Sequence, residues 1–324
     1  MRSAAIDARL ACVVCHEPFV LVDGPTLSCA RCGRDVSRLA DGRWDFRLRS
    51  DDSLIYTRRY APAGVAAALD APLQTERPSQ PPRNGFAEAI PVHLTAAQVS
   101  YLPAGRPGQV ALDLGCGHGM QRGLLEQLGY DCYAIDYEGS AADDLVDAHA
   151  LPLRNASIDL VMSIAVLEHL ADPLRAASEV LRVLVPGGAF IGTVAFLEPF
   201  HDNSFFHFTH LGVSWALRTS GFEVEMIAPI PGWDVVRAQI EMELASGSRA
   251  SRTLAKVAAA PFVWALRGYG AAGRTLARAR ERYARPLLTA RHAGAFFFVA
   301  RRPVAEPTAS LHDLPVNVPR AASG

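Results

Sequence analysis

The sequence contains no apolar run of about 18 residues, the length that a membrane-spanning helix needs. Its first residues, MRSAAIDARLACVVC, lack the apolar core of a secretory signal. Charge of one sign is also missing, because 32 basic and 33 acidic residues leave no overall field to attract nucleic acid or a membrane. Lysine is nearly absent, with Lys256 alone, which we attribute to genome composition. These absences predict a cytoplasmic protein whose only route to a membrane is peripheral contact.

The 324 residues suffice for about two domains, or for one domain with attachments. Half of them are apolar and a fifth are charged, which is typical of a globular protein and excludes a largely disordered one. The stretch APLQTERPSQPPRNG predicts an extended linker that ends near residue 85. The expected organisation is a small module at 8–48, a linker at 49–85, a larger domain at 86–302 with a helical insertion at 235–290, and a disordered tail at 303–324.

Four of the six cysteines form two closely spaced pairs, Cys12 with Cys15 and Cys29 with Cys32. The two thiolates of a C-x2-C turn can face one point, so two such pairs can close a tetrahedral zinc shell. A four-cysteine shell has no open position, so the metal would be structural. Two disulfides are the alternative, which the lack of a secretion signal disfavours.

The residues between the two cysteine pairs, PFVLVDGPTLSC, predict a small hairpin. The stretch from LACVVC to GRWDF resembles the Trm112-like zinc ribbons that precede or partner methyltransferases. Its Arg31, Arg34 and Arg38 could contact RNA, or they could form an ordinary solvated face.

A second group of motifs begins at residue 109. The apolar run QVALDL predicts a buried strand, and a glycine turn follows it before the helically spaced MQRGLLEQLG. Glycines there let the backbone approach a ligand, and the helix N-terminus offers free N–H groups. The next strand, YDCYAID, ends in Asp136, where a nucleotide-binding α/β fold places a carboxylate for ribose hydroxyls. The alternative role for Asp136 is that of a turn residue or helix cap.

Strands and helices alternate through the rest of this domain. Strands are expected at 145–153, 158–164, 189–196, 221–230 and 292–302, and helices at 91–102, 171–185 and 213–221. Alternation with short connections predicts an α/β fold with a doubly wound, seven-stranded, mainly parallel sheet.

The segments LDLGCGHG, AID, VDAHALPLRNASIDLVMSIAVLEHLADP and EVLRVLVPGGAF, in that order, resemble class I S-adenosylmethionine (SAM)-dependent methyltransferases, most closely the methyltransferase type 11 group. The resemblance covers about 110–230 and a last strand at 292–302, and it implies a Rossmann-like fold that binds SAM. In this family Asp113 would support the glycine loop and reach the cofactor's amino group, and Asp136 would hold the ribose. The other implied cofactor residues are Gly115, Gly117 and Gly119 around the methionine part, Tyr137, Asp147 and Ala148 at the adenine, and Ser163 and Ile164 in the methyl-transfer chamber.

Two details qualify this resemblance. A Rossmann dehydrogenase would have the glycine pattern G-x-G-x-x-G, whereas the third glycine here comes one residue earlier, which favours the methyltransferase. Only ten residues separate Asp136 from Asp147, too few for the second helix of the family. We expect a turn there, and an adenine side that is more open.

Glu168 and His169 close the loop after the fourth strand of this domain, in AVLEHL. In the resembling ubiquinone-type O-methyltransferases, an acidic residue three positions before this pair completes a metal site. Ala165 stands there in this sequence, so no metal triad is expected. His169 is a candidate catalytic residue; alternatively, Glu168 caps the next helix and His169 is hydrogen-bonded beneath the cofactor.

The segment EPFHDNSFFHFTH at 198–210 borders the acceptor pocket in this fold. Histidines titrate near neutral pH, so His201 or His207 could act as a general base on a hydroxyl. Alternatively, Thr209 caps the next helix and the histidines are surface or packing residues.

About 60 residues separate the last two strands, where the minimal fold has a short hairpin. Residues 249–291 contain ten basic residues and one acid, Glu281, and the stretch LAKVAAAPFVWALRGYG has an apolar face. Such a segment suits peripheral contact with an anionic membrane, phosphate contacts on RNA, or a helical lid with a solvated arginine face.

The sequence therefore favours a SAM-dependent methyltransferase that acts on a small-molecule, lipid-linked or glycan acceptor, with O-methylation as the first expectation. RNA base methylation, with the zinc ribbon gripping rRNA or tRNA, and a non-catalytic cofactor-binding scaffold are the alternatives. The expected cofactors are SAM and a structural zinc ion, and nothing in the sequence indicates the oligomeric state.

Overall fold

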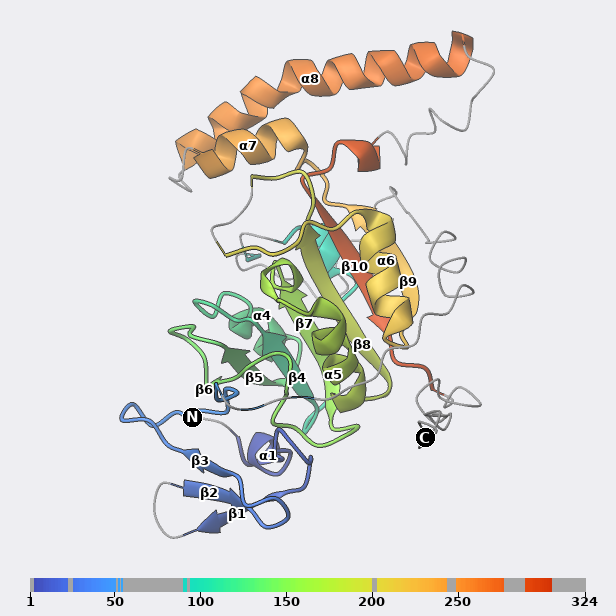
Figure 1. Ribbon diagram of the computed structural model, residues 1–324. Helices are drawn as coiled ribbons and strands as arrows, with labels where there is room; N and C mark the ends of the chain where they lie inside the picture. The colour runs from blue at the N-terminus through green and yellow to red at the C-terminus, as the bar shows by residue number, and fades with distance from the viewer. Residues whose placement is uncertain are drawn as a thin grey trace, which may run out of the picture.

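The computed structural model describes residues 3–22, 26–50, 52, 54, 90–91, 94–199, 203–243, 249–276 and 289–304. Figure 1 shows a central sheet with helices on both faces, a small sheet near the N-terminus, and a long helix, α8, beyond one end of the central sheet. Most of the expected linker at 49–85 and nearly all of the tail expected at 303–324 lie outside the described residues.

The central sheet has seven strands. They are β4 (Val110–Leu114), β5 (Asp131–Asp136), β6 (Asp144–Leu145), β7 (Ile158–Ile164), β8 (Leu184–Ala195), β9 (Glu223–Pro229) and β10 (Ala295–Arg301). Their order across the sheet is β6-β5-β4-β7-β8-β10-β9. The strands from β6 to β8 pair in parallel, and β10 runs antiparallel to both β8 and β9. The predicted seven-stranded, mainly parallel sheet is confirmed.

Side-chain alternation along the strands divides the core into two layers. Val110 and Leu112 face the layer that contains apolar side chains of α5 (Pro173–Val183) and α6 (His210–Thr219). Ala111 faces the opposite layer, which α3 (Ala96–Val99) and α4 (Arg122–Gln127) cover. Helices therefore protect both faces of the sheet, and the strand ends remain for ligands.

The helix starts follow from capping residues. Asp172 accepts a hydrogen bond from the backbone of Arg175 at the start of α5, and Thr209 accepts one from Gly212 at the start of α6, as expected for Thr209. The helix expected at 91–102 is shorter in the structure, because only α3 is helical there, behind a Thr95 and Gln98 capping box.

Two strands differ in length from the sequence prediction. The strand expected at 145–153 is reduced to β6, because the chain after it turns toward α5, where the Leu151 N–H donates to the buried carboxylate of Glu179. The strand expected from 189 begins earlier, since Leu184 already pairs with Ile158 and β8 continues through Pro186.

The N-terminal module comprises α1 (Ala4–Asp7), β1 (Phe19–Val22), β2 (Thr26–Cys29) and β3 (Asp35–Ser37). β1 and β2 form the expected antiparallel hairpin. The chain after β3 then runs beside β6, where Leu145 N donates to Trp44 O at 3.0 Å and Phe46 N donates to Leu145 O at 2.8 Å. Because Trp44 and Phe46 are buried in the same cluster as the central sheet, the module and the sheet share one core.

The chain between β9 and β10 forms α7 (Val235–Glu243) and α8 (Arg249–Leu276), which pack together. Both lie beyond the end of the sheet where β7 and β8 finish (Figure 1). Among the residues that the structure describes, no helix combines the length and the apolarity that crossing a membrane would require.

Candidate functional site

The parallel strands β4, β5, β7 and β8 end at one edge of the sheet, and the glycine loop lies there between β4 and α4. Gly115, Gly117 and Gly119 adopt φ angles of 73°, 51° and 74°, which side chains rarely allow. A Cβ at Gly115 would overlap the side chain of Val166, whereas a Cβ at Gly117 would meet no described atom within 4 Å. The loop therefore needs glycine where it touches the loop after β7, and it borders open space at Gly117.

Asp113 lies beneath this loop, on the buried strand β4. Its side chain is 1% exposed, and one carboxylate oxygen, Oδ2, has no hydrogen-bond partner in the described structure. Burial raises the pKa of Asp113 to about 7. An oxygen that is buried without a partner is costly to a fold, so this one is suited to accept a hydrogen bond from a ligand.

Asp136 ends β5 and faces the glycine loop. Its Oδ2 accepts from Gly117 N at 2.9 Å, and its Oδ1 accepts from Glu138 N at 3.0 Å and Gly139 N at 2.9 Å. Oδ1 thus has both lone pairs engaged, whereas Oδ2 keeps one for a ligand hydroxyl. Asp136 therefore stabilises the turn, as one alternative expected, and still has an acceptor position for a ligand.

The turn after β5 replaces the second helix, as expected, and the N-terminal module contacts this turn. Arg47 of the N-terminal module lies over the ring of Tyr137, with 5.4 Å from the guanidinium carbon to the ring centre, and Arg43 Nη1 donates to Gly139 O at 3.0 Å. The module thus contacts this turn, and the more open adenine side stays a prediction. Tyr137 itself remains 54% exposed.

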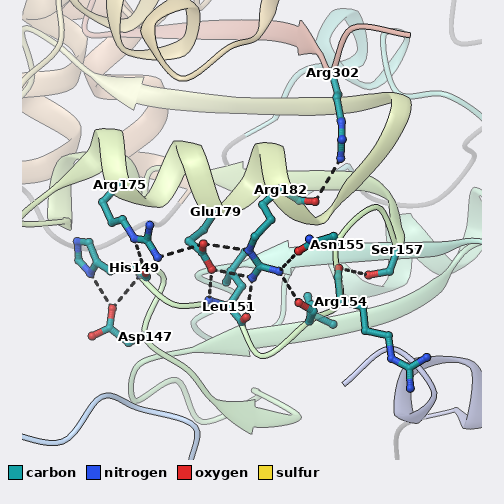
Figure 2. Close-up of polar contacts among 11 residues, drawn as sticks. Asp147, His149, Leu151, Arg154, Asn155, Ser157, Arg175, Glu179, Arg182 and Arg302 are labelled. Carbon is teal, nitrogen blue, oxygen red and sulfur yellow. Dashed lines mark hydrogen bonds and ion pairs between the residues drawn. The ribbon is translucent and has the colours of Figure 1, made fainter. Parts of the chain in front are cut away.

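Asp147 follows β6 and is tied to His149 (Figure 2). The His149 Nδ1 lies 2.6 Å from Asp147 Oδ1, and the His149 Nε2 accepts from the backbone of Asp172 at 3.1 Å. An Nε2 that accepts must be unprotonated, so Nδ1 carries the proton and donates it to Asp147. Burial acts to raise the pKa of Asp147, but these hydrogen bonds from His149 outweigh it and lower the pKa.

The loop that carries Asp147 and Ala148 is fixed to α5 by a charged network (Figure 2). Glu179 is buried and contacts Arg175 at 3.2 Å and Arg182 at 2.7 Å. Arg175 Nε donates to His149 O, and Arg182 donates to the carbonyls of Leu151 and Leu153. These contacts fix the loop at the place where the sequence predicted the adenine. The arginine side chains reach carbonyl groups far away in the sequence, so no local pattern could have predicted these bonds.

Ser163 and Ile164 form the end of β7, beside the glycine loop. Both are buried, and the Ser163 hydroxyl oxygen has no hydrogen-bond partner among the described atoms. Like Asp113, it is a polar group that a bound ligand could satisfy.

Glu168 was weighed in the sequence as a cap of the next helix, and the structure gives that role to another residue. Asp172 caps α5, whereas Glu168 is fully buried and its Oε1 accepts from Ala195 N at 3.1 Å. Its Oε2 has no partner within the described residues. Burial, reinforced by the nearby Glu198, raises the pKa of Glu168 to about 7.

Glu198 is a site residue that the sequence reasoning did not single out for chemistry. It follows β8, and its Oε2 accepts a hydrogen bond from Trp233 Nε1 at 3.0 Å. Burial raises its pKa to about 7 against that hydrogen bond. Two carboxyl groups that titrate near neutral pH therefore lie at the ends of β7 and β8.

The candidate histidines are placed differently from one another. His207 is exposed and its Nδ1 lies 2.8 Å from Phe196 O, so Nδ1 donates and Nε2 remains an acceptor. His169 is half-buried in the turn after β7, and His201 lies outside the described residues. His210 packs on Phe296, and burial lowers its pKa.

The four cysteines of the N-terminal module lie together, with their Sγ atoms within 4.8 Å of one another. The Sγ atoms of Cys12 and Cys32 are 3.5 Å apart and those of Cys15 and Cys29 are 3.3 Å apart, much longer than a disulfide bond. All four are free thiols, and Gly33 follows them with φ of 71°. The disulfide alternative is not realised, and the cluster has the donor set and size that suit a tetrahedral metal ion.

The three arginines that the sequence suggested for RNA are engaged within the module. Arg34 is buried in an ion pair with Asp52 at 2.5 Å, Arg31 pairs with Glu17 at 3.0 Å, and Arg38 lies over the ring of Trp44. Each serves an intramolecular contact, so the structure provides no row of unengaged arginines at these positions.

Residues 112–192 match a protein-family model described as "Methyltransferase domain". The chain is 28% identical over 186 residues to a "Probable S-adenosylmethionine-dependent methyltransferase" of Mycolicibacterium smegmatis, across 47% of this chain and 71% of that protein. The region that matches the family model contains the glycine loop, Asp136 and β7.

Two further relatives are matched over shorter stretches. A tRNA (carboxymethyluridine(34)-5-O)-methyltransferase of Macaca fascicularis is 34% identical over 100 residues, across 28% of this chain and 15% of that protein. A "Ubiquinone biosynthesis O-methyltransferase" of Cereibacter sphaeroides is 27% identical over 128 residues, across 33% of this chain and 48% of that protein. The chain thus spans less than half the length of these two relatives.

Proposed function

Because the chain is an enzyme with a SAM-dependent methyltransferase domain, we propose that it methylates an oxygen atom of a small-molecule, lipid-linked or glycan acceptor. The observation that carries the cofactor assignment is the Asp113 oxygen that lacks a partner beneath the glycine loop. The ubiquinone-type relative, whose name specifies an O-methyltransferase, is consistent with an oxygen acceptor.

The residues at the sheet edge offer acceptor atoms that support SAM binding. Asp113 would accept from the cofactor's amino group, Gly115, Gly117 and Gly119 would surround its methionine part, and Asp136 Oδ2 would accept from a ribose hydroxyl. The other proposed contacts are Tyr137, Asp147 and Ala148 at the adenine, and Ser163 and Ile164 at the reacting end. When bound, SAM supplies an electrophilic methyl group on a sulfonium that leaves as a neutral thioether.

The chain's own chemical task is then to orient the acceptor and to take its proton. His207 is the proposed base, because its Nδ1 is held by Phe196 O and its Nε2 is an acceptor. As the acceptor oxygen bonds to the methyl carbon, the proton of its hydroxyl would pass to Nε2. His169 and His201 remain further candidates, and the raised pKa values of Glu168 and Glu198 support proton storage nearby.

We also propose that Cys12, Cys15, Cys29 and Cys32 hold a structural zinc ion in the 8–48 module. The four free thiols within 4.8 Å of one another support this assignment. The proposed enzyme domain covers 86–302, including the helical insertion at 235–290. The engaged arginines of the module weigh against the RNA alternative.

Cofactor binding is tested first with Asp136→Ala, measured by isothermal titration with SAM. Losing the ribose acceptor should weaken binding at least about tenfold, which corresponds to about 1.4 kcal/mol. The matched control is Asp131→Ala at the opposite end of β5, where Asp131 contacts Ser3 and affinity should not change. Wild-type affinity in Asp136→Ala would contradict the assignment.

The pH dependence of binding tests Asp113. Its pKa of about 7 means that the carboxyl ionises across neutral pH, and a cationic amino group prefers the ionised form. SAM affinity should therefore rise from pH 6 to pH 8, and Asp113→Asn should flatten this dependence.

Transfer of radiolabelled methyl from SAM into a fractionated lysate then tests the acceptor. Label in the lipid or small-molecule fraction supports the proposal, and His207→Gln should lower kcat with little change in SAM affinity. Label in RNA would overturn the acceptor class. SAM binding without any labelled product would favour the scaffold alternative.

A further inference from the structure

Helix α8 is held to the protein along one narrow face. Ala255 and Ala259 are buried there, and the ring of Phe262 meets His292 edge-on at 5.5 Å. α8 packs on α7, and Figure 1 shows it extending along the outside of the molecule. Because the described contact face consists mainly of alanines, larger apolar side chains of α8 lie outside it.

A second face of α8 exposes large apolar side chains. Leu254 is 56% exposed, Val257 is 65% exposed and Trp264 is 69% exposed. The spacing from Leu254 to Val257, Pro261 and Trp264 is three, four and three residues, which places them along one side of a helix. Soluble proteins rarely display such a stripe unless it binds a partner.

The basic residues of α8 follow the same helical period. Arg249, Arg252, Lys256, Arg267 and Arg274 are its charged residues, and its sequence has no acid. At 100° per residue, these five positions fall within an arc of about 60° that lies between the apolar stripe and the face of Ala255 and Ala259. α8 therefore carries three separate faces, which are packed, apolar and basic.

We propose that α8 docks the protein on an anionic lipid bilayer, with Leu254, Val257 and Trp264 entering the headgroup boundary. Apolar side chains beside a basic row suit such a surface, because the acyl region accepts the apolar side chains and the lipid phosphates attract the basic ones. No described helix can span a membrane, so the contact is interfacial. The docking does not depend on which acceptor is methylated.

Charge and chemistry favour a bilayer over other occupants. A second copy of α8 would bring a second row of five basic residues with no acid against the first. Nucleic acid would use the basic row but not Leu254 and Val257 of the stripe, because stacking on bases requires aromatic or guanidinium planes. A lipid surface uses the aliphatic side chains and the basic row together.

The position of α8 relates this docking to the candidate site. β9 ends and β10 begins at the same edge of the sheet as the ends of β7 and β8, so the insertion leaves and returns there. Trp233, just before α7, donates to Glu198 at that edge. A protein docked through α8 would thus hold the acceptor side of its site close to the bilayer.

The test is flotation of the full chain, without SAM, on vesicles of phosphatidylglycerol and phosphatidylcholine in equal parts or of phosphatidylcholine alone. We expect binding to the anionic vesicles that weakens as salt rises from 0.1 M to 0.5 M. Leu254→Ser/Val257→Ser should reduce vesicle affinity about tenfold or more. Trp264→Phe should remove the vesicle-induced blue shift of tryptophan fluorescence.

The matched control is Val20→Ser in the N-terminal module, where Val20 is 54% exposed. It removes a similar apolar group elsewhere and should leave vesicle binding unchanged, and thermal melts of all variants check folding. No flotation with anionic vesicles, or equal flotation of Leu254→Ser/Val257→Ser and wild type, would overturn the proposal. So would a dimer that this double variant dissociates, or tighter binding to RNA than to vesicles.

This assay contains no SAM and no acceptor, so its result is independent of the proposed methyl transfer. A chain that binds vesicles but methylates nothing would keep the docking and lose the activity. A chain that methylates a water-soluble acceptor without binding vesicles would do the reverse.

Discussion

Trp44 and Phe46 of the N-terminal module are 5% and 0% exposed, whereas Leu254 and Val257 of α8 are 56% and 65% exposed. Both regions are additions to the same central sheet. The module adds backbone hydrogen bonds to β6 and large side chains to the core. The insertion contributes Ala255 and Ala259 to its contact and leaves its larger aliphatic side chains outside.

The difference in burial indicates that the N-terminal module is part of the fold, whereas α8 presents side chains that a partner could cover. Burying large apolar side chains contributes about 1.5–3 kcal/mol each, so the module stabilises the sheet that it joins. Alanines contribute little, so the sheet gains little from α8. Leu254 and Val257 of α8 are exposed, so burying them against an external surface would still release free energy.

The largest effect should follow from removing the metal ligands of the module. Cys12→Ser/Cys15→Ser should abolish metal binding, because two of four thiolates cannot close the shell. Since the module shares its core with the sheet, the thermal midpoint of the whole domain should fall by about 10 °C or more. Elemental analysis should find one zinc ion per wild-type chain and none in the variant.

Two outcomes would break the comparison at this point. Wild-type protein purified without any metal would remove the zinc assignment. A variant that loses zinc but keeps the wild-type melting curve would mean that the module is an independent attachment, as α8 is. Cys132→Ser, on β5 outside the cluster, is the control for loss of a thiol, and it should retain the metal.

A smaller effect should separate Phe46 from Val257. Phe46→Ala creates a cavity in the shared core and should lower the free energy of unfolding by about 3–5 kcal/mol. Val257→Ala removes an exposed group and should change it by less than about 0.5 kcal/mol. Urea denaturation measures both, and similar losses would show that α8 is also packed into the fold.

Local patterns account for most of what could be predicted from the sequence. The strands at 110–114, 131–136 and 158–164 are short apolar runs with turn residues beside them, and Thr209 stands where a cap is needed. The glycine spacing predicted a loop that adopts positive φ angles at all three glycines. The cysteine spacing predicted thiols that meet in space.

The rest depended on contacts between distant residues, which have no local signal. Trp44 pairs with Leu145, which lies about a hundred residues away in the sequence. No local pattern places the module beside the short turn after β5, so that turn was expected to leave open space. Glu168 preceded a helix and was weighed as its cap, although the strands around it bury it and Asp172 takes that role. The role of Glu198 required knowing that Trp233 returns to the end of β8.

The finest test of the comparison lies where the module touches the turn after β5. Arg47→Ala removes the guanidinium over Tyr137 and its ion pair with Asp45 at 2.7 Å, contacts worth about 0.5–1 kcal/mol each at exposed sites. If the module shapes the adenine side, SAM affinity should fall about two- to fivefold while the melting curve changes little. Arg38→Ala is the matched control, because it removes a similar contact over Trp44 within the module, also at 5.4 Å. Equal SAM affinity in both variants would limit the module to a structural role. A loss of affinity in Arg47→Ala alone would make the module part of the cofactor site.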